Sequence, residues 1–176
     1  MSVRTIASLT ISTWLVASAQ SAKETSVPNM PSMNMNTAQP QTEPHSRAHA
    51  KAKITVQSSE AKPYDQTANP ALMELRLSET FAGDIDGESP VRALQVQRDD
   101  HSARQVTMQR FRGKLGGRQG SFVLQGQETV ENGKIKATWS VVPGSGTADL
   151  SSLRGEGGFV GDFGKGSDGW LDYWFE

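Results

Sequence analysis

The sequence contains no cysteine. Disulfide bonds, thiolate metal sites and a lipid-modified N-terminal cysteine are therefore excluded, and the folded part must be held together by packing alone. Histidine is also scarce, with His45, His49 and His101 the three present. Because these lie far apart and two precede the folded part, we expect no zinc site, no Ser-His-Asp triad and no cofactor.

A surplus of either charge is missing as well. Lys and Arg number 18 against 19 Asp and Glu, so the net charge is −1. Nucleic-acid-binding proteins concentrate basic residues on one surface, whereas here they are scattered, as at Arg110 and Arg112. We therefore expect no nucleic-acid partner.

Long hydrophobic runs are absent too. The longest is the mostly apolar stretch 6–16, preceded by Arg4 and followed by Ala17-Ser18-Ala19. A basic start, a short apolar run and a small-x-small motif are typical of a secretory signal peptide, and the run falls short of the roughly 20 residues that cross a bilayer. We predict a signal peptide at 1–19, export to the periplasm or medium, and no integral membrane segment after cleavage.

Residues 20–49 are rich in Ser, Pro, Asn, Gln, Thr and Met and contain almost no β-branched aliphatic or aromatic residue to bury. Such a segment cannot recover its ordering entropy by burial, which predicts a disordered linker. Its methionines Met30, Met33 and Met35, with the two histidines at its end, are soft donors that leave Cu(I) capture open. Incidental methionine in a disordered linker is the simpler interpretation.

From residue 50 to 176 the pattern changes to short segments rich in β-branched, aromatic and aliphatic residues. These alternate with turn motifs such as Asp86-Gly87, Gly116-Gly117 and Asn132-Gly133, which supply the positive φ of tight hairpins. The pattern predicts eight strands: 51–57, 72–81, 91–98, 104–112, 120–128, 134–142, 153–160 and 169–175.

Eight strands joined mostly by short connections lie antiparallel to their chain neighbours, and closing the sheet removes its exposed edges. We therefore predict an all-β fold, an eight-stranded antiparallel up-and-down barrel. Its interior is just wide enough to be filled by side chains or to hold one small ligand. An open sandwich remains the structural alternative.

Four blocks carry a family resemblance: FAGDIDGES at 81–89, RFRGKLGGRQGSFVL at 110–124, WSVVPGSGT at 139–147 and LRGEGGF at 153–159. In this order and spacing they resemble the bacterial domain-of-unknown-function (DUF) 3224 family. The resemblance implies a barrel similar to allene oxide cyclase and, more distantly, to lipocalins, and it implies no established activity. The sequence departs from the pattern at Gln109, where the family usually has Glu.

Alternation places one acidic side chain inside the expected barrel. In 72–81 the residues Leu75, Leu77 and Phe81 share a face, and Glu79 shares it with them. In 104–112 Arg110 shares parity with Val106 and Met108, so an interior guanidinium is expected beside the interior carboxyl. Burial raises the pKa of a carboxyl group and prepares it for acid–base work. Glu79 and Arg110 are therefore the candidate catalytic pair, the alternative being that both lie at a barrel mouth.

Aromatic residues concentrate near the C-terminus and supply candidate ligand-lining residues. Trp139 and Tyr173, with Phe81 and Met108 from earlier strands, are the predicted lining. Ordinary core packing is the alternative for this cluster. Because both faces of 169–175 are apolar, we expect the outer face to be covered by the linker, a loop or a second copy in a homodimer.

Three functions remain open from these patterns. The leading hypothesis is a module that binds a small apolar or amphipathic molecule inside the barrel. The second is a cofactor-free cyclase or isomerase resembling allene oxide cyclase, with Glu79 as base and Arg110 as its orienting partner. The third is a structural barrel with a wholly filled core.

Overall fold

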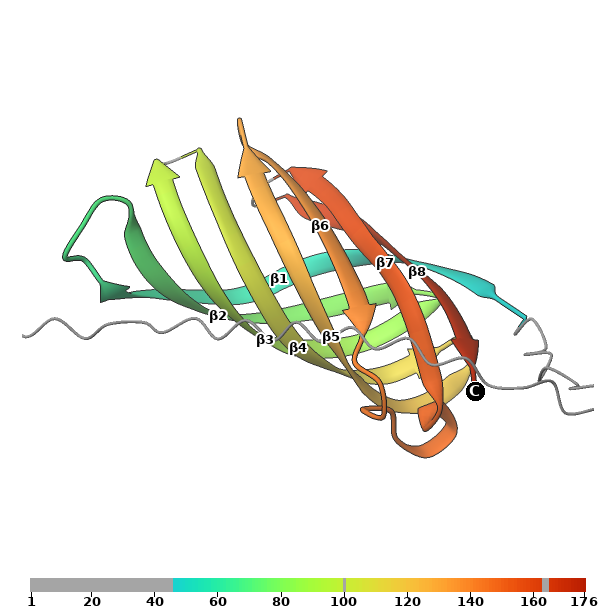
Figure 1. The fold of residues 1–176 in the computed structure, drawn as a ribbon. Helices are drawn as coiled ribbons and strands as arrows, with labels where there is room; N and C mark the ends of the chain where they lie inside the picture. Colours follow the sequence, from blue (N-terminus) through green and yellow to red (C-terminus); the bar gives the residue numbers. More distant parts are fainter. Residues whose placement is uncertain (1–45, 100, 163–164) are drawn as a thin grey trace, which may run out of the picture. The chain divides into compact units, whose positions relative to one another are not determined.

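The computed structural model describes residues 46–99, 101–162 and 165–176. The predicted signal peptide and Met30, Met33 and Met35 lie outside the described residues. Eight antiparallel strands follow one another around a closed barrel in chain order (Figure 1), which confirms the predicted fold. The elements are β1 (Ala48–Asp65), β2 (Ala71–Gly83), β3 (Ile85–Asp99), β4 (Ser102–Leu115), β5 (Arg118–Glu131), β6 (Lys134–Val141), the short 3₁₀ helix η1 (Ala148–Leu150), β7 (Leu153–Asp162) and β8 (Gly166–Phe175).

Two of the predicted hairpin turns have the expected backbone. Asn132 and Gly133 between β5 and β6 have φ values of 52° and 72°, and Gly116 and Gly117 between β4 and β5 have 55° and 82°. These left-handed conformations are the ones that glycine and asparagine tolerate best. The sequence therefore located these turns because the chemistry of a tight turn is local.

The turn predicted at Asp86-Gly87 is wrong. Both residues lie within β3, and the chain bends instead at Asp84. The Asp84 backbone N–H donates to the Lys51 carbonyl at 2.8 Å, and its carbonyl accepts from the Gly116 N–H at 2.9 Å. Contacts with two distant segments therefore fix this bend, and no local turn motif predicts it.

One half of the barrel interior is filled with apolar side chains. Phe111 and Phe122 are fully buried, with ring centroids 4.9 Å apart, and Phe81 packs edge-on against Phe111 at 5.6 Å. Trp139 lies 5.4 Å from Phe159 on the far wall. Leu150 of η1, also fully buried, closes this end where β6 leads into β7. We call this half the closed end.

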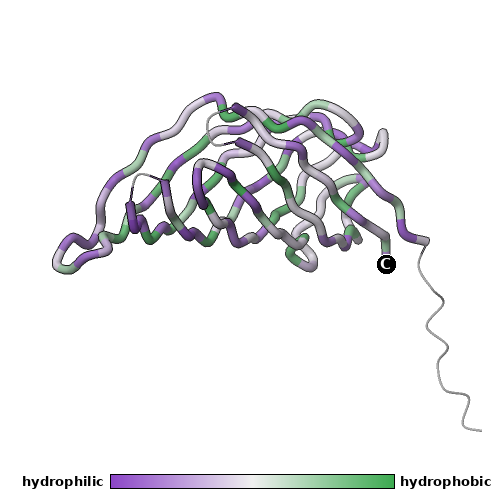
Figure 2. Tube along the Cα trace, turned by 90° about the horizontal axis from the view of Figure 1, so that it is seen from above, coloured by the Kyte–Doolittle hydropathy of each residue, from purple (hydrophilic) through white to green (hydrophobic). Residues whose placement is uncertain are grey.

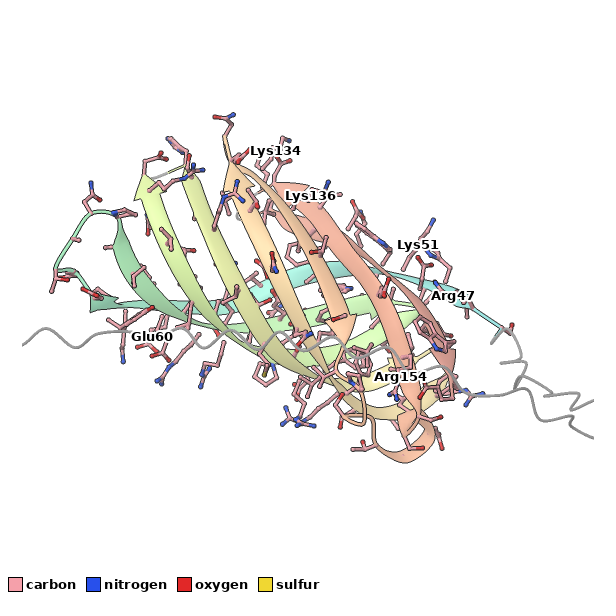
Figure 3. All side chains as sticks on the ribbon, in the orientation of Figure 1. Arg47, Lys51, Glu60, Lys134, Lys136 and Arg154 are labelled. Atoms are coloured by element: carbon pink, nitrogen blue, oxygen red, sulfur yellow. The ribbon has the colours of Figure 1, made fainter. Side chains whose placement is uncertain are left out.

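Outward positions carry the charges. Hydrophobic and hydrophilic residues alternate along the strands (Figure 2), and the labelled side chains of Lys51, Lys134 and Lys136 project away from the sheet (Figure 3). Within the described ranges, no helix is long and apolar enough to cross a membrane.

The other half of the barrel is open. β1 pairs with β8 only from Ala48 to Ile54, whereas Thr55–Asp65 pairs with β2 alone among the described strands. One edge of this part of β1 therefore has no partner strand in the described part of the chain, and we call it the free edge. Some inward side chains at this end, such as Ala103 and Val130, are buried, whereas others are only half-buried and reach solvent. The half-buried inward residues include Met73, Leu75, Leu77, Gln95, Gln105 and Thr107.

Candidate functional site

Polar side chains collect inside the barrel between the closed end and the open end. The strand register identifies them, because each pairs across the sheet with another inward residue: Glu79 with Ser89, and Gln105 with Glu128. Thr107 and Gln109 follow Gln105 on the same face of β4. We call these residues the interior polar cluster: Glu79, Ser89, Gln105, Thr107, Gln109 and Glu128.

Glu79 is the most buried ionisable member of the cluster. Its side chain is 8% exposed, and its Oε2 has no hydrogen-bond partner within the described residues. Burial, with a smaller contribution from the negative charge of Glu128, raises the pKa of Glu79 from 4.5 to about 7. Desolvation favours the neutral form of an acid, and a nearby like charge acts in the same direction.

Glu128 approaches Glu79 from β5. Burial raises its pKa as well, and hydrogen bonds from Gln105 and Thr107 partly offset that rise. The Gln105 Nε2 donates directly to Glu128 Oε2. These hydrogen bonds favour the anion of Glu128, and Glu79 Oε2 has no such donor among the described residues, so folding raises the pKa of Glu79 more strongly than that of Glu128.

Several buried atoms of the cluster lack partners. Glu79 Oε2, Gln105 Oε1 and Gln109 Oε1 are acceptors, and Ser89 Oγ can act in either role; none has a hydrogen-bond partner in the described part of the chain. Gln109 is 6% exposed and Ser89 is fully buried. Each buried polar atom without a partner costs about 1–3 kcal/mol, so folding alone does not account for this arrangement.

Basic side chains do not compensate the two carboxyls. Among the inward positions that the structure describes, the remaining charged residue is Arg118, whose guanidinium lies 4.1 Å from the Phe175 ring centre at the closed end. The cluster is therefore acidic and rich in acceptors. Chemically, a carboxyl that titrates near neutral pH beside a second carboxylate can donate or accept a proton.

The structure brings together some of the predicted site residues. Glu79 faces the interior, as predicted, and Phe81 and Trp139 are buried there at 3% and 6% exposure. Tyr173 is half-buried against the core, with its ring 5.9 Å from that of Phe175. These four residues share the interior of the barrel.

The predictions that Arg110 and Met108 face the interior are wrong. Both point outward from β4; Arg110 is exposed and Met108 is 56% exposed. They do share parity with Val106, as predicted, but Phe111 and Leu115 show that the opposite parity faces inward. The error arose because the interior is polar at this level, so that the apolar residues of β4 mark the outer face.

Sequence reasoning missed Gln105, Thr107 and Glu128 as interior residues, and it noted Gln109 only as a departure from the family pattern. A usable signal was present. Large aromatic residues at the other end of each strand fix its parity, since Phe111 in β4 and Phe122 in β5 leave little choice about which side is buried. Counting two residues at a time from these rings would have placed all four residues inside.

A large hollow lies outside the barrel. It has a volume of about 930 Å³ and spans the outer faces of β2 to β7. Its wall includes Leu94, Val106 and Met108, which are 50%, 54% and 56% exposed. This outer groove shares Thr107 with the interior polar cluster, and the other members of the cluster do not line it.

The folded part of the chain is similar to proteins of a known family. The family model described as "Protein of unknown function (DUF3224)" matches residues 50–175. The chain belongs to the DUF3224 family. A crystal structure of a DUF3224-family protein of unknown function from Shewanella oneidensis MR-1 is similar, with a TM-score of 0.60 and 27% sequence identity over 74% of this chain and 98% of that chain. A search of curated proteins gives no match. Family membership thus gives the barrel and leaves the activity open.

Proposed function

We propose that this DUF3224 barrel binds a small amphipathic molecule, which enters through the open end and places its polar group against the interior polar cluster. The observation that supports the proposal best is the set of buried polar atoms without partners at Glu79, Ser89, Gln105 and Gln109. A ligand that forms hydrogen bonds with these atoms would offset the unfavourable free energy of burying them without partners.

The walls around the cluster suit the apolar part of such a ligand. Leu75 and Leu77 face inward and are half-buried, and Val91 and Ala93 beside them are buried. Apolar surface that is reached only through the interior contributes roughly 25 cal/mol per Å² when a ligand covers it. A barrel filled throughout, the structural alternative, does not account for this half-buried apolar wall.

A second function, a cofactor-free isomerase or cyclase, is favoured by one observation. Glu79 has a pKa of about 7 beside a second carboxyl group, which suits a general acid–base residue. Arg110 cannot orient it, because Arg110 lies on the outer face. In this version Gln105 and Thr107 hold Glu128 as the anion while Glu79 exchanges a proton with the substrate.

The sequence also supports a location for this function. The basic, apolar and small-residue pattern of 1–19 favours an exported protein. We infer that ligand binding takes place in the periplasm or outside the cell. The intact mass of the protein from the exported fraction tests this, since a product that still begins at Met1 would contradict it.

Binding can be tested with the neutral fluorescent probe N-phenyl-1-naphthylamine. We expect saturable binding that quenches Trp139 emission. Gln95→Trp, which adds bulk on a half-buried inward position near the open end, should weaken binding at least about tenfold.

Gln125→Trp is the matched control, because Gln125 is exposed in the outer groove. Loss of binding in Gln125→Trp with normal binding in Gln95→Trp would place the probe outside and overturn the proposal. So would the absence of any saturable binding to the folded wild-type protein.

A further inference from the structure

We infer that the ligand's polar group is a cation with several N–H donors, namely the primary ammonium group of an amphipathic amine. This inference rests on the proposed function and adds a chemical class to it. The two inward carboxyls, the unpartnered Gln109 Oε1 and the lack of a compensating base at this level of the interior point to it.

Hydrogen-bond roles distinguish an ammonium group from other polar groups. The unpartnered atoms of Glu79, Gln105 and Gln109 are all acceptors. An ammonium group offers three donors and no acceptor, whereas a hydroxyl group brings acceptor lone pairs of its own. Gln109 supports this assignment independently of the carboxyl groups, because it is uncharged. It is 6% exposed and lies on the same inward face as Gln105.

The charges of the cluster also favour an ammonium group. Glu79 and Glu128 are buried carboxyls, and the charge of Glu128 disfavours the ionisation of Glu79. A buried charge is strongly unfavourable unless it is paired, and the basic residues on the neighbouring strands, Arg76, Arg92, Arg104 and Arg110, all face outward. The cross-strand neighbours of the two carboxyls are uncharged: Val56, Ser89, Gln105 and Ala137.

A divalent metal ion fits the cluster less well. Metal sites in proteins draw on several carboxylate or imidazole ligands. No group of three or more such side chains suited to a metal occurs among the residues that the structure describes. Carboxamide oxygens and two carboxyls instead suit a group that needs hydrogen-bond acceptors on several sides, as an ammonium group does.

The alkyl part of the amine has a wall to lie against. Leu75 and Leu77 continue along β2 from Glu79 toward the open end, on the same inward face. An ammonium group at the carboxyls therefore leaves its alkyl chain directed past these leucines to the mouth. An unbranched amine of moderate length meets both requirements.

The experiment compares three ligands of equal chain length on the intact protein: octylamine, octanol and octanoate. At about pH 7.5 the amine is protonated and the acid is ionised. We expect octylamine to displace N-phenyl-1-naphthylamine at least about tenfold more strongly than octanol, and octanoate to be the weakest. Calorimetry in two buffers of different ionisation enthalpy should show proton release as the amine binds, because a cation favours ionised Glu79.

Glu79→Gln and Glu128→Gln should each weaken octylamine at least about tenfold while leaving the neutral probe bound, which shows that the barrel is still folded. Glu88→Gln is the control, since Glu88 is exposed on the adjacent strand β3. Equal binding of amine and alcohol, or an unchanged amine affinity in both Gln variants, overturns the cation assignment and leaves interior binding intact. If neither the probe nor any of the three ligands binds, both proposals fail.

Discussion

At the scale of single residues, the barrel interior holds an acid that the fold disfavours in its charged form. Glu79 is 8% exposed and lies near a second carboxyl group that Gln105 and Thr107 stabilise as the anion. The ionisation of both of two neighbouring buried carboxyl groups is energetically unfavourable. The difference between them follows from the hydrogen-bond donors, which Glu128 has and Glu79 Oε2 lacks.

This difference predicts how stability changes with pH. The pKa of Glu79 rises from 4.5 to about 7 on folding, so the folded state binds more protons than the unfolded state between these values. The free energy of unfolding should therefore fall as pH rises from about 4.5 to about 7, by up to about 3 kcal/mol from this residue. Glu128, whose pKa is also raised, adds a smaller change of the same sign.

Urea denaturation of wild type, Glu79→Gln and the exposed control Glu88→Gln across this pH range measures the effect. Glu79→Gln should flatten most of the decline and be more stable than wild type at about pH 8, while Glu88→Gln should follow wild type. An unflattened decline in Glu79→Gln would show that this carboxyl is not the group that folding protonates.

How well single residues were predicted depends on which end of the barrel they occupy. Near the closed end, apolar residues mark the inner face, so Phe81 and Trp139 were placed correctly. At the level of the interior polar cluster the rule reverses, and Arg110 was assigned to the wrong side. Residue type alone therefore cannot assign a face where the interior is polar.

At the scale of elements, β1 is unusual because half of it has one partner strand. Among the strands that the structure describes, Thr55–Asp65 pairs with β2 alone, and a free edge is a template for association with another chain. Two irregularities, between Val56 and Ser58 and between Pro63 and Asp65, interrupt this part of the strand. Pro63 has no backbone N–H, and Lys62 adds a charge, so the edge carries the features that discourage such pairing.

Removing these features should expose the edge. We expect the double variant Lys62→Thr with Pro63→Val to associate into dimers or larger species, because the edge then gains an N–H donor and loses a charge. Size-exclusion chromatography with light scattering over a range of concentrations measures this. Pro90→Val is the matched control, since β3 lies between β2 and β4. A double variant that stays as small as the control would mean that the irregularities alone block the edge.

Element boundaries show the same division between local and distant causes. The positive φ values at Asn132 and Gly116 were predictable from glycine-rich turn motifs. The bend at Asp84 was not, because backbone contacts with Lys51 and Gly116 hold it. The length of β1 was underestimated for a similar reason, since pairing with β2 extends it through residues of weak strand propensity up to Asp65.

At the scale of the described domain, the barrel divides into a closed end filled with apolar side chains and an open end where β1 and β8 no longer pair. The number of strands was predictable because turns and alternation are local signals. The extent of closure was not, because it depends on the register between β1 and β8, which are far apart in sequence. The sequence pattern is the same for a barrel closed along its whole length and for one that is open at one end.

Hydrogen exchange should reveal this division. Residues of β4 and β5 near Phe111 and Phe122 pair with each other around fully buried rings, and the amides of Ser121 and Val123 donate to Thr147 and Ser145 in the connection between β6 and β7, so these amides should exchange only through global unfolding. Amides of Thr55–Asp65 that face the free edge have no strand to protect them within the described residues, and they should exchange orders of magnitude faster. Exchange followed by mass spectrometry of peptides from each region makes the comparison.

The same experiment links closure to function. An octylammonium ion held between Glu79 and Glu128 would contact β2 and β5, so it should slow exchange at the open ends of these strands more than at the free edge of β1. Uniform protection along β1 without ligand would contradict an open end. If the ligand slowed exchange only in the outer groove strands around Leu94 and Met108, binding would lie on the outside, and the acidic interior would need another explanation.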